Sequence, residues 1–103
     1  KKHFGTDIAA NPNESVLATM DGTVFLSTYT AETGYVIGVQ HSQDFVSIYK
    51  HCGSLLKKEG ERVKGGEAIA LVGNSGTLST GPHLHFELWY KGHPVNPEKY
   101  IVF

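Results

Sequence analysis

The chain has 103 residues, a formal net charge of -1 and a single cysteine. This length supports one domain with a modest core, and a near-neutral charge without a Lys/Arg stripe excludes an electrostatic nucleic-acid footprint. One cysteine excludes an internal disulfide and a Cys-rich zinc site, so any metal must be held by histidine and carboxylate side chains. No apolar run approaches the roughly 18 residues of a membrane span.

Short β-branched and aromatic runs, separated by glycine-containing turns, follow one another along the chain. The expected strand pairs are 16–18 with 23–29 across Asp21-Gly22, 35–40 with 45–49, and 63 with 68–72 across Gly65-Gly66, and a last strand, His83–Tyr90, leads into Lys91-Gly92. Such runs favour β-hairpins, and no segment keeps helical apolar spacing over about eleven residues without Gly or Pro. The sequence therefore predicts an all-β fold, a compact antiparallel β-sheet or sandwich with short hairpins.

His3 and Asp7 form the first candidate group. Gly5 and the β-branched Thr6 between them argue against a helix, but in a bent or extended segment an imidazole and a carboxylate can still converge on one ion. Together with a strand histidine they would give the His and carboxylate set that suits zinc, with a fourth position left open as in catalytic sites. Taken alone, an Asp7 that caps a turn beside a disordered His3 is the commoner arrangement.

Tyr49-Lys50-His51 ends the β-rich run that starts at Phe45. We expect His51 at a strand end, where functional side chains often emerge. Adjacent Cys52 raises the alternative of a Cys–His nucleophilic pair. Neighbouring strand residues point to opposite faces, so Cys52 is predicted instead to be a small buried hydrophobe. His41 and His93 are assigned no role.

His83-Leu84-His85 lies in the last predicted strand. Side chains alternate across a strand, so His83, His85, Glu87 and Trp89 share one face, and the apolar set 84, 86, 88 and 90 faces the core. A lone His-x-His is usually the polar face of an amphipathic strand. Here it is a candidate metal-binding or catalytic pair, because the groups at His3–Asp7 and His51 have matching chemistry.

Three motifs follow in order: His3-Phe-Gly-Thr-Asp7, Tyr49-Lys50-His51 and Gly81-Pro-His-Leu-His-Phe-Glu87. They resemble the His-x-Gly-x-Asp, Tyr-x-His and Gly-Pro-His-Leu-His-Phe-Glu motifs of the lysostaphin-type (LytM-type) zinc metalloendopeptidases, which are peptidoglycan hydrolases. The segments 60–73 and 95–97 also look like this family, so the resemblance covers almost the whole chain. It implies the duplicated-hybrid-motif β fold of LytM-type peptidases.

The resemblance also implies roles for single residues. His3, Asp7 and His85 would be ligands of a Zn²⁺ cofactor. His51 and His83 would be unligated catalytic histidines, and which of them acts as the general base stays open. Glu87, on the same strand face, is a candidate partner that orients a metal ligand, with a solvated surface carboxylate as the alternative.

As a whole, the resemblance predicts a zinc metalloendopeptidase that hydrolyses peptide bonds of bacterial peptidoglycan, in cross-bridges or stem peptides, with a metal-activated water. Residues 1–103 would be one catalytic domain excised from a longer secreted or membrane-anchored protein. We expect it to be periplasmic, cell-wall-associated or extracellular, monomeric, and to bind peptidoglycan peptides but no nucleic acid. Tyr29, Tyr35 or Trp89 are candidates for walling a strand-lined groove that accepts an extended peptide.

Two other functions compete. A catalytically inactive LytM-type scaffold would bind or activate another cell-wall hydrolase, although here every ligand position and both histidine positions are filled. A biotinyl- or lipoyl-type carrier domain would use a lysine at a hairpin tip, for which Lys64 is a weak match, and it leaves the histidines unexplained.

Overall fold

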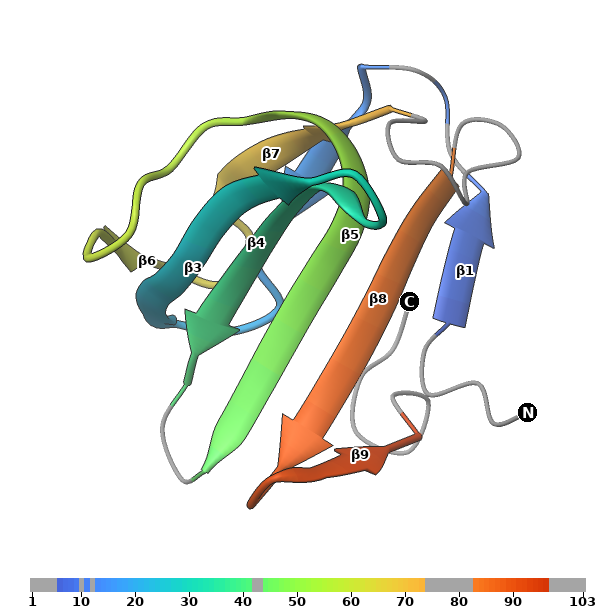
Figure 1. Ribbon diagram of the computed structural model, residues 1–103. Coiled ribbons are helices and arrows are strands. Elements are labelled where there is room, and N and C mark those ends of the chain that lie inside the picture. The colour runs from blue at the N-terminus through green and yellow to red at the C-terminus, as the bar shows by residue number, and fades with distance from the viewer. Residues whose placement is uncertain (1–5, 10, 12, 42–43, 74–82, 97–103) are drawn as a thin grey trace.

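The computed structural model describes residues 6–9, 11, 13–41, 44–73 and 83–96, and for residues 6–9 and 83 the backbone alone. Within these ranges the chain forms nine strands and no helix. The described residues therefore include no helix that could cross a membrane. The strands are β1 (Thr6–Ala9), β2 (Ser15–Leu17), β3 (Gly22–Thr30), β4 (Gly34–Gln40), β5 (Phe45–Leu55), β6 (Arg62–Val63), β7 (Ala68–Val72), β8 (His83–Tyr90) and β9 (His93–Val95) (Figure 1). The predicted all-β fold is confirmed.

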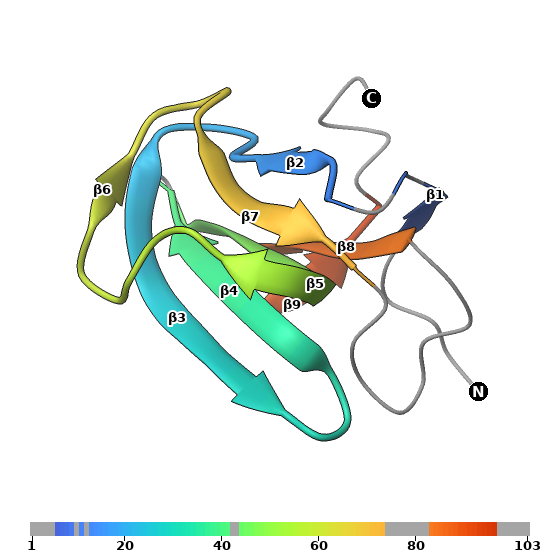
Figure 2. The same cartoon turned by 90° about the horizontal axis from the view of Figure 1, so that it is seen from above.

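The strands form one curled antiparallel sheet. Its main path has the order β1-β8-β5-β4-β3-β6, while β2 pairs with β7, β7 pairs with the end of β5, and β9 pairs with β8. Seen from above, β2 and β7 lie on one side of the layer formed by β3, β4, β5 and β8 (Figure 2). The sheet thus has one face closed by its own strands and another face that stays open.

Two of the expected hairpins, 16–18 with 23–29 and 63 with 68–72, are wrong. β2 pairs with β7, and the start of β3 pairs with β6, with Gly22 opposite Val63. Gly22 is not a turn residue here but a packing residue, because a Cβ on it would lie 2.5 Å from the backbone oxygen of Gln40. Turn residues mark where the chain reverses, but they do not specify which strands become neighbours.

The other two expected reversals are confirmed. β4 and β5 pair as a hairpin, and β8 turns into β9 at Lys91-Gly92. Lys91 and Gly92 have φ angles of 51° and 79°. Positive φ at both central residues is the geometry of a two-residue type I′ hairpin turn.

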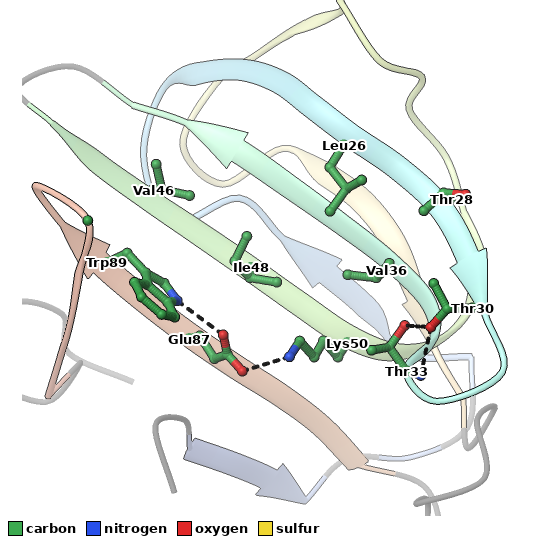
Figure 3. Close-up of a pocket in the computed structure, with 11 residues that line it drawn as sticks. Leu26, Thr28, Thr30, Thr33, Val36, Val46, Ile48, Lys50, Glu87 and Trp89 are labelled. Atoms are coloured by element: carbon green, nitrogen blue, oxygen red, sulfur yellow. Dashed lines mark hydrogen bonds and ion pairs between the residues drawn. The ribbon is translucent and has the colours of Figure 1, made fainter. Parts of the chain in front are cut away.

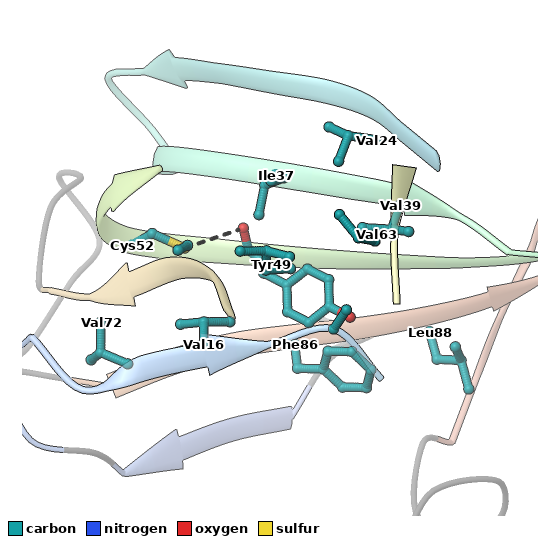
Figure 4. Close-up of a cluster of buried hydrophobic side chains, with 13 residues drawn as sticks. Val16, Val24, Ile37, Val39, Tyr49, Cys52, Val63, Val72, Phe86 and Leu88 are labelled. Carbon is teal, nitrogen blue, oxygen red and sulfur yellow. Dashed lines mark hydrogen bonds between the residues drawn. The ribbon is translucent and has the colours of Figure 1, made fainter. Parts of the chain in front are cut away.

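The core lies between the main layer and β2–β7 (Figure 4). Tyr49 of β5 and Phe86 of β8 are fully buried, with ring centroids 5.3 Å apart. Phe86 and Leu88 are buried, as the alternation in this strand predicts. The buried cluster contains Val16, Ala18, Val24, Ile37, Val39, Tyr49, Cys52, Val63, Ile69, Ala70, Val72, Phe86 and Leu88.

His41 belongs to a buried polar chain at the edge of this core. Its Nδ1 lies 2.8 Å from the Asp21 carbonyl oxygen, and its Nε2 lies 2.7 Å from Ser47 Oγ, which is 2.8 Å from the Tyr49 hydroxyl. Burial lowers the pKa of His41. A neutral ring must then donate from Nδ1, since a carbonyl can only accept. This histidine therefore has a structural role, which accounts for its place outside the candidate site.

Candidate functional site

One extra residue in β5 brings His51 into the site. Ile37 of β4 is opposite Tyr49, and Tyr35 is opposite Cys52, so two steps along β4 match three along β5. This is a β-bulge, which bends a strand and redirects a side chain. Both Tyr49 and Cys52 can therefore face the core, with Lys50 and His51 between them. His51 lies inside β5, so the expectation that it ends a strand is wrong.

The bulge forces His51 into an uncommon backbone conformation. Its φ angle is 64°, in the left-handed region, where non-glycine residues are infrequent and histidine is among the better tolerated. Its N–H donates to the Thr33 carbonyl oxygen at 2.9 Å, which ties it to the β3–β4 turn. That turn is itself fixed by Thr30 Oγ1, which accepts the Thr33 N–H at 2.9 Å. Strain of this kind is typical of functional sites.

His51 and His85 meet across the β5–β8 pair. Lys50 is directly opposite His85, and the rings of His51 and His85 are 6.2 Å apart between centroids, at 81° to each other. His51 is buried, and His85 is half-buried. Two imidazoles separated by 34 positions are thus placed side by side by neighbouring strands.

Glu87 fixes the orientation of His85. Its Oε2 accepts hydrogen bonds from His85 Nε2 and Lys50 Nζ, each at 2.9 Å, and its Oε1 accepts one from Trp89 Nε1 at 3.0 Å. The hydrogen bond from His85 is the largest cause that lowers the pKa of Glu87 to about 2, against the opposing effect of burial. The carboxylate is therefore ionised at neutral pH and holds a proton on Nε2. A metal would consequently be bound through Nδ1 of His85.

The other predicted ligands can be placed only in part. The β1–β8 register puts the backbone of Asp7 directly opposite His85, and that of Ala9 opposite His83. His3 lies outside the described residues. Among the residues whose side chains are described, no three His, Cys, Asp or Glu groups converge on a metal position. The donor types nevertheless fit zinc, since an imidazole backed by a carboxylate stands opposite a strand that carries a second carboxylate residue.

A groove of about 490 Å³ runs over the open face of the sheet (Figure 3), and its lining includes Lys50 and Glu87, two neighbours of His85. Its residues come from β3, β4, β5, β8 and the β8–β9 turn: Leu26, Thr28, Thr30, Thr33, Val36, Val46, Ile48, Lys50, Glu87, Trp89 and Gly92. Trp89 lines this groove as expected. Tyr29 and Tyr35 are not among its lining residues; they form an exposed edge-to-face pair with centroids 5.0 Å apart.

The sequence analysis missed that β3 and β4 line this groove, and that Lys50 lines it and pairs with Glu87. For β4, the sequence contained one indication. β4 is apolar at nearly every position, Gly34–Gln40, which is typical of a strand covered on both faces.

Cys52 has no place in the chemistry of the site. It is fully buried, and burial raises the pKa of its thiol to about 12. Nucleophilic cysteines need a lowered pKa and access to solvent. The structure confirms Cys52 as a buried small residue, on the opposite side of the strand from the groove that adjoins His51.

Residues 1–97 match the model of peptidase family M23. The chain belongs to this family. The resemblance to LytM-type peptidases that the three motifs predicted is thereby confirmed. The chain is 40% identical over 98 residues to the murein hydrolase activator NlpD of Escherichia coli, a match that covers 94% of this chain and 25% of NlpD.

Two further M23 relatives are enzymes by name. Over 97 residues the chain is 38% identical to the peptidoglycan DD-endopeptidase ShyA of Vibrio cholerae, covering 94% of this chain and 22% of ShyA. The structure of a zinc-containing peptidase from Vibrio cholerae superposes with a TM-score of 0.86 at 39% identity, over 90% of this chain and 28% of that one. This M23 chain thus spans about a quarter of the length of its relatives, which include both an activator and an endopeptidase.

Proposed function

We propose that this M23 chain is a zinc-dependent endopeptidase that hydrolyses peptide bonds of peptidoglycan. The observation that carries the proposal is the hydrogen bond from His85 Nε2 to the ionised Glu87, beside His51 and at the end of a groove. A carboxylate behind a histidine is the usual support of a metal ligand. The left-handed φ of His51 beside it supports the proposal, because backbone strain of this kind clusters at active sites.

In this proposal His3, Asp7 and His85 hold the zinc. When bound, zinc supplies a Lewis acid that polarises the scissile carbonyl and activates water at neutral pH. Glu87 would keep the proton of His85 on Nε2 and leave Nδ1 available to the metal.

His51 and His83 would not bind the metal, and one of them would take a proton from the attacking water. The other donates a hydrogen bond to the oxygen on which negative charge develops. Which histidine does which stays open. The bulge at His51 serves the reaction by fixing a ring that a regular strand would direct into the core.

The substrate and location follow from the named relatives. A murein hydrolase activator and a peptidoglycan endopeptidase both concern the cell wall. We propose that this chain acts, as a monomer, on peptidoglycan peptides in the periplasm, in the cell wall or outside the cell.

The test compares the native chain with His85→Ala and with His93→Ala, whose exposed histidine in β9 serves as the control. We expect one zinc ion per native chain by metal analysis, and release of peptides from purified sacculi by mass spectrometry. The His85 variant should lose both, and the His93 variant neither. Native chain that binds zinc and cuts no sacculus or cross-bridge peptide would overturn the proposal.

A second candidate function is supported by the 40% identity to an activator of murein hydrolases. In that case the chain would bind sacculi or a hydrolase without cutting peptides itself. Zinc-free, inactive chain that still sediments with sacculi, or that stimulates a purified cell-wall hydrolase, would favour this function over the endopeptidase.

A further inference from the structure

Trp89 lies at the far end of the groove from His85, on the same strand and the same face. The two are four residues apart, which is about 13 Å along an extended strand. An extended peptide of roughly four residues covers the same distance. A peptide positioned at His85 that follows the groove would therefore reach the indole.

The lining of the groove favours an uncharged peptide. Among the described residues that line it, Lys50 and Glu87 carry the charges, and they neutralise each other in an ion pair at 2.9 Å. The remaining floor is aliphatic, and Thr28, Thr30 and Thr33 lie toward the end of the groove that Lys50 occupies, away from Trp89 (Figure 3). Such a surface fits small aliphatic side chains of an extended strand, and it penalises acidic residues that would find no unpaired cation.

The indole of Trp89 is fixed in place, not loosely exposed. Its Nε1 donates to Glu87 Oε1 at 3.0 Å, and the other oxygen of the same carboxylate accepts from His85 Nε2 at 2.9 Å. One carboxylate in the lining of the groove therefore sets the position of both the indole ring of Trp89 and the neighbouring imidazole of His85. Rigid aromatic side chains of this kind provide contact area at a low entropy cost.

We propose that Trp89 is a specificity-determining residue: its ring, held in place by Glu87, contacts a small aliphatic residue of an extended peptide about four residues from the scissile bond. This inference rests on the proposed function for the position of the scissile bond. The preference for an uncharged aliphatic peptide comes from the groove itself.

Binding is tested without turnover, in the zinc-free 103-residue chain. Trp89 is its single tryptophan, so its fluorescence reports on the groove alone. We expect tetra-alanine to shift the emission in a saturable way, whereas tetra-glutamate and N-acetylglucosamine oligomers do not. A shift with the sugar oligomers alone would overturn the peptide in favour of a glycan ligand, and no shift with any probe would overturn the contact.

Variants test the ring by calorimetric binding of tetra-alanine. Trp89→Ala should weaken binding about tenfold, the size of one buried aromatic contact, whereas Trp89→Phe should stay within about threefold because it keeps the ring. Tyr29→Ala, an exposed aromatic away from the groove, should change nothing. If the Ala variant does not melt cooperatively, Trp89→Leu takes its place. Equal affinity in all these chains would overturn the proposal.

Kinetics separate this inference from the proposed function. In zinc-loaded chain, Trp89→Ala should raise KM for cross-linked peptides with kcat nearly unchanged, because the contact is remote from the reacting bond. Cleavage without any effect of Trp89 on KM would overturn the inference and leave the endopeptidase standing. Trp89-dependent peptide binding without cleavage would overturn the endopeptidase and support the inference.

Discussion

Replacing Glu87 by glutamine tests whether its charge holds the site together. Gln keeps the shape and removes the charge that accepts from His85, Lys50 and Trp89. One of its two groups is an NH₂ donor, which cannot accept from a neighbouring N–H. The variant therefore imitates a Glu87 that is protonated at every pH.

The structure gives the size and the sign of the effect. The pKa of Glu87 is lowered from 4.5 to about 2, first by the hydrogen bond from His85 and then by those from Lys50 and Trp89. A lowering of this size corresponds to about 3 kcal/mol. Because the folded pKa is depressed, this stabilisation is complete above about pH 4.5 and is lost as the pH falls toward about 2. The variant should thus be less stable by about 3 kcal/mol at neutral pH and nearly equal to the native chain at the acid end.

The assay is urea denaturation of metal-free chain, followed by circular dichroism, from about pH 7 to about pH 2.5. Glu67→Gln is the control, since Glu67 also pairs with a lysine, Lys57, at 2.7 Å, but its side chain is 35% exposed against 10% for Glu87, so its charge is better screened. Its curve should follow the native one closely. If the free energy of unfolding of the native chain and of Glu87→Gln fell by the same amount as the pH was lowered, the charge of Glu87 would not stabilise the fold through His85, Lys50 and Trp89, and this prediction would be refuted.

Three further outcomes are expected. Because His51 has a φ of 64°, His51→Asn should keep the stability of the fold in urea denaturation, while the β-branched His51→Val should cost about 1–3 kcal/mol. Cys52, with a thiol pKa of about 12, should resist iodoacetamide in folded chain and react after unfolding, as followed by mass spectrometry; fast labelling of folded chain would contradict its burial. Gly73→Ala would place a Cβ 2.4 Å from the Cα of Gly53, so its thermal midpoint should fall well below that of Gly65→Ala, whose nearest backbone contact would be at 3.3 Å.

The sequence was informative wherever local alternation decides the structure. A strand with period two separates the face of His85, Glu87 and Trp89 from the apolar face, and the hydrogen bonds among these three side chains confirm the shared face. The all-β class follows in the same way, from turns and short β-rich runs. The roles assigned to His3, Asp7 and His83 rest on the family motifs and stay predictions.

Features that depend on distant segments could not be predicted from the sequence. Regular alternation from Tyr49 would place His51 in the core, and only the mismatch between β4 and β5 shows that it is not there. The pairing of β2 with β7 joins segments more than fifty positions apart, a choice that loop signals do not encode. The groove, likewise, exists only once β8, β5, β4 and β3 lie in this order in one sheet.

Because His51 is the extra residue in β5, its removal should leave the pairing of β5 with β4 intact. A chain shortened by His51 alone would restore strict alternation, with Tyr49 and Cys52 still inward and Lys50 still outward, because the core contacts on either side already match β4. Loss and gain of one codon would then convert a sheet with this histidine into a plain sheet and back. Under the proposed function, this insertion would supply one of the two unligated histidines and none of the predicted zinc ligands, so its loss would remove that histidine and leave the peptide-binding surface in place.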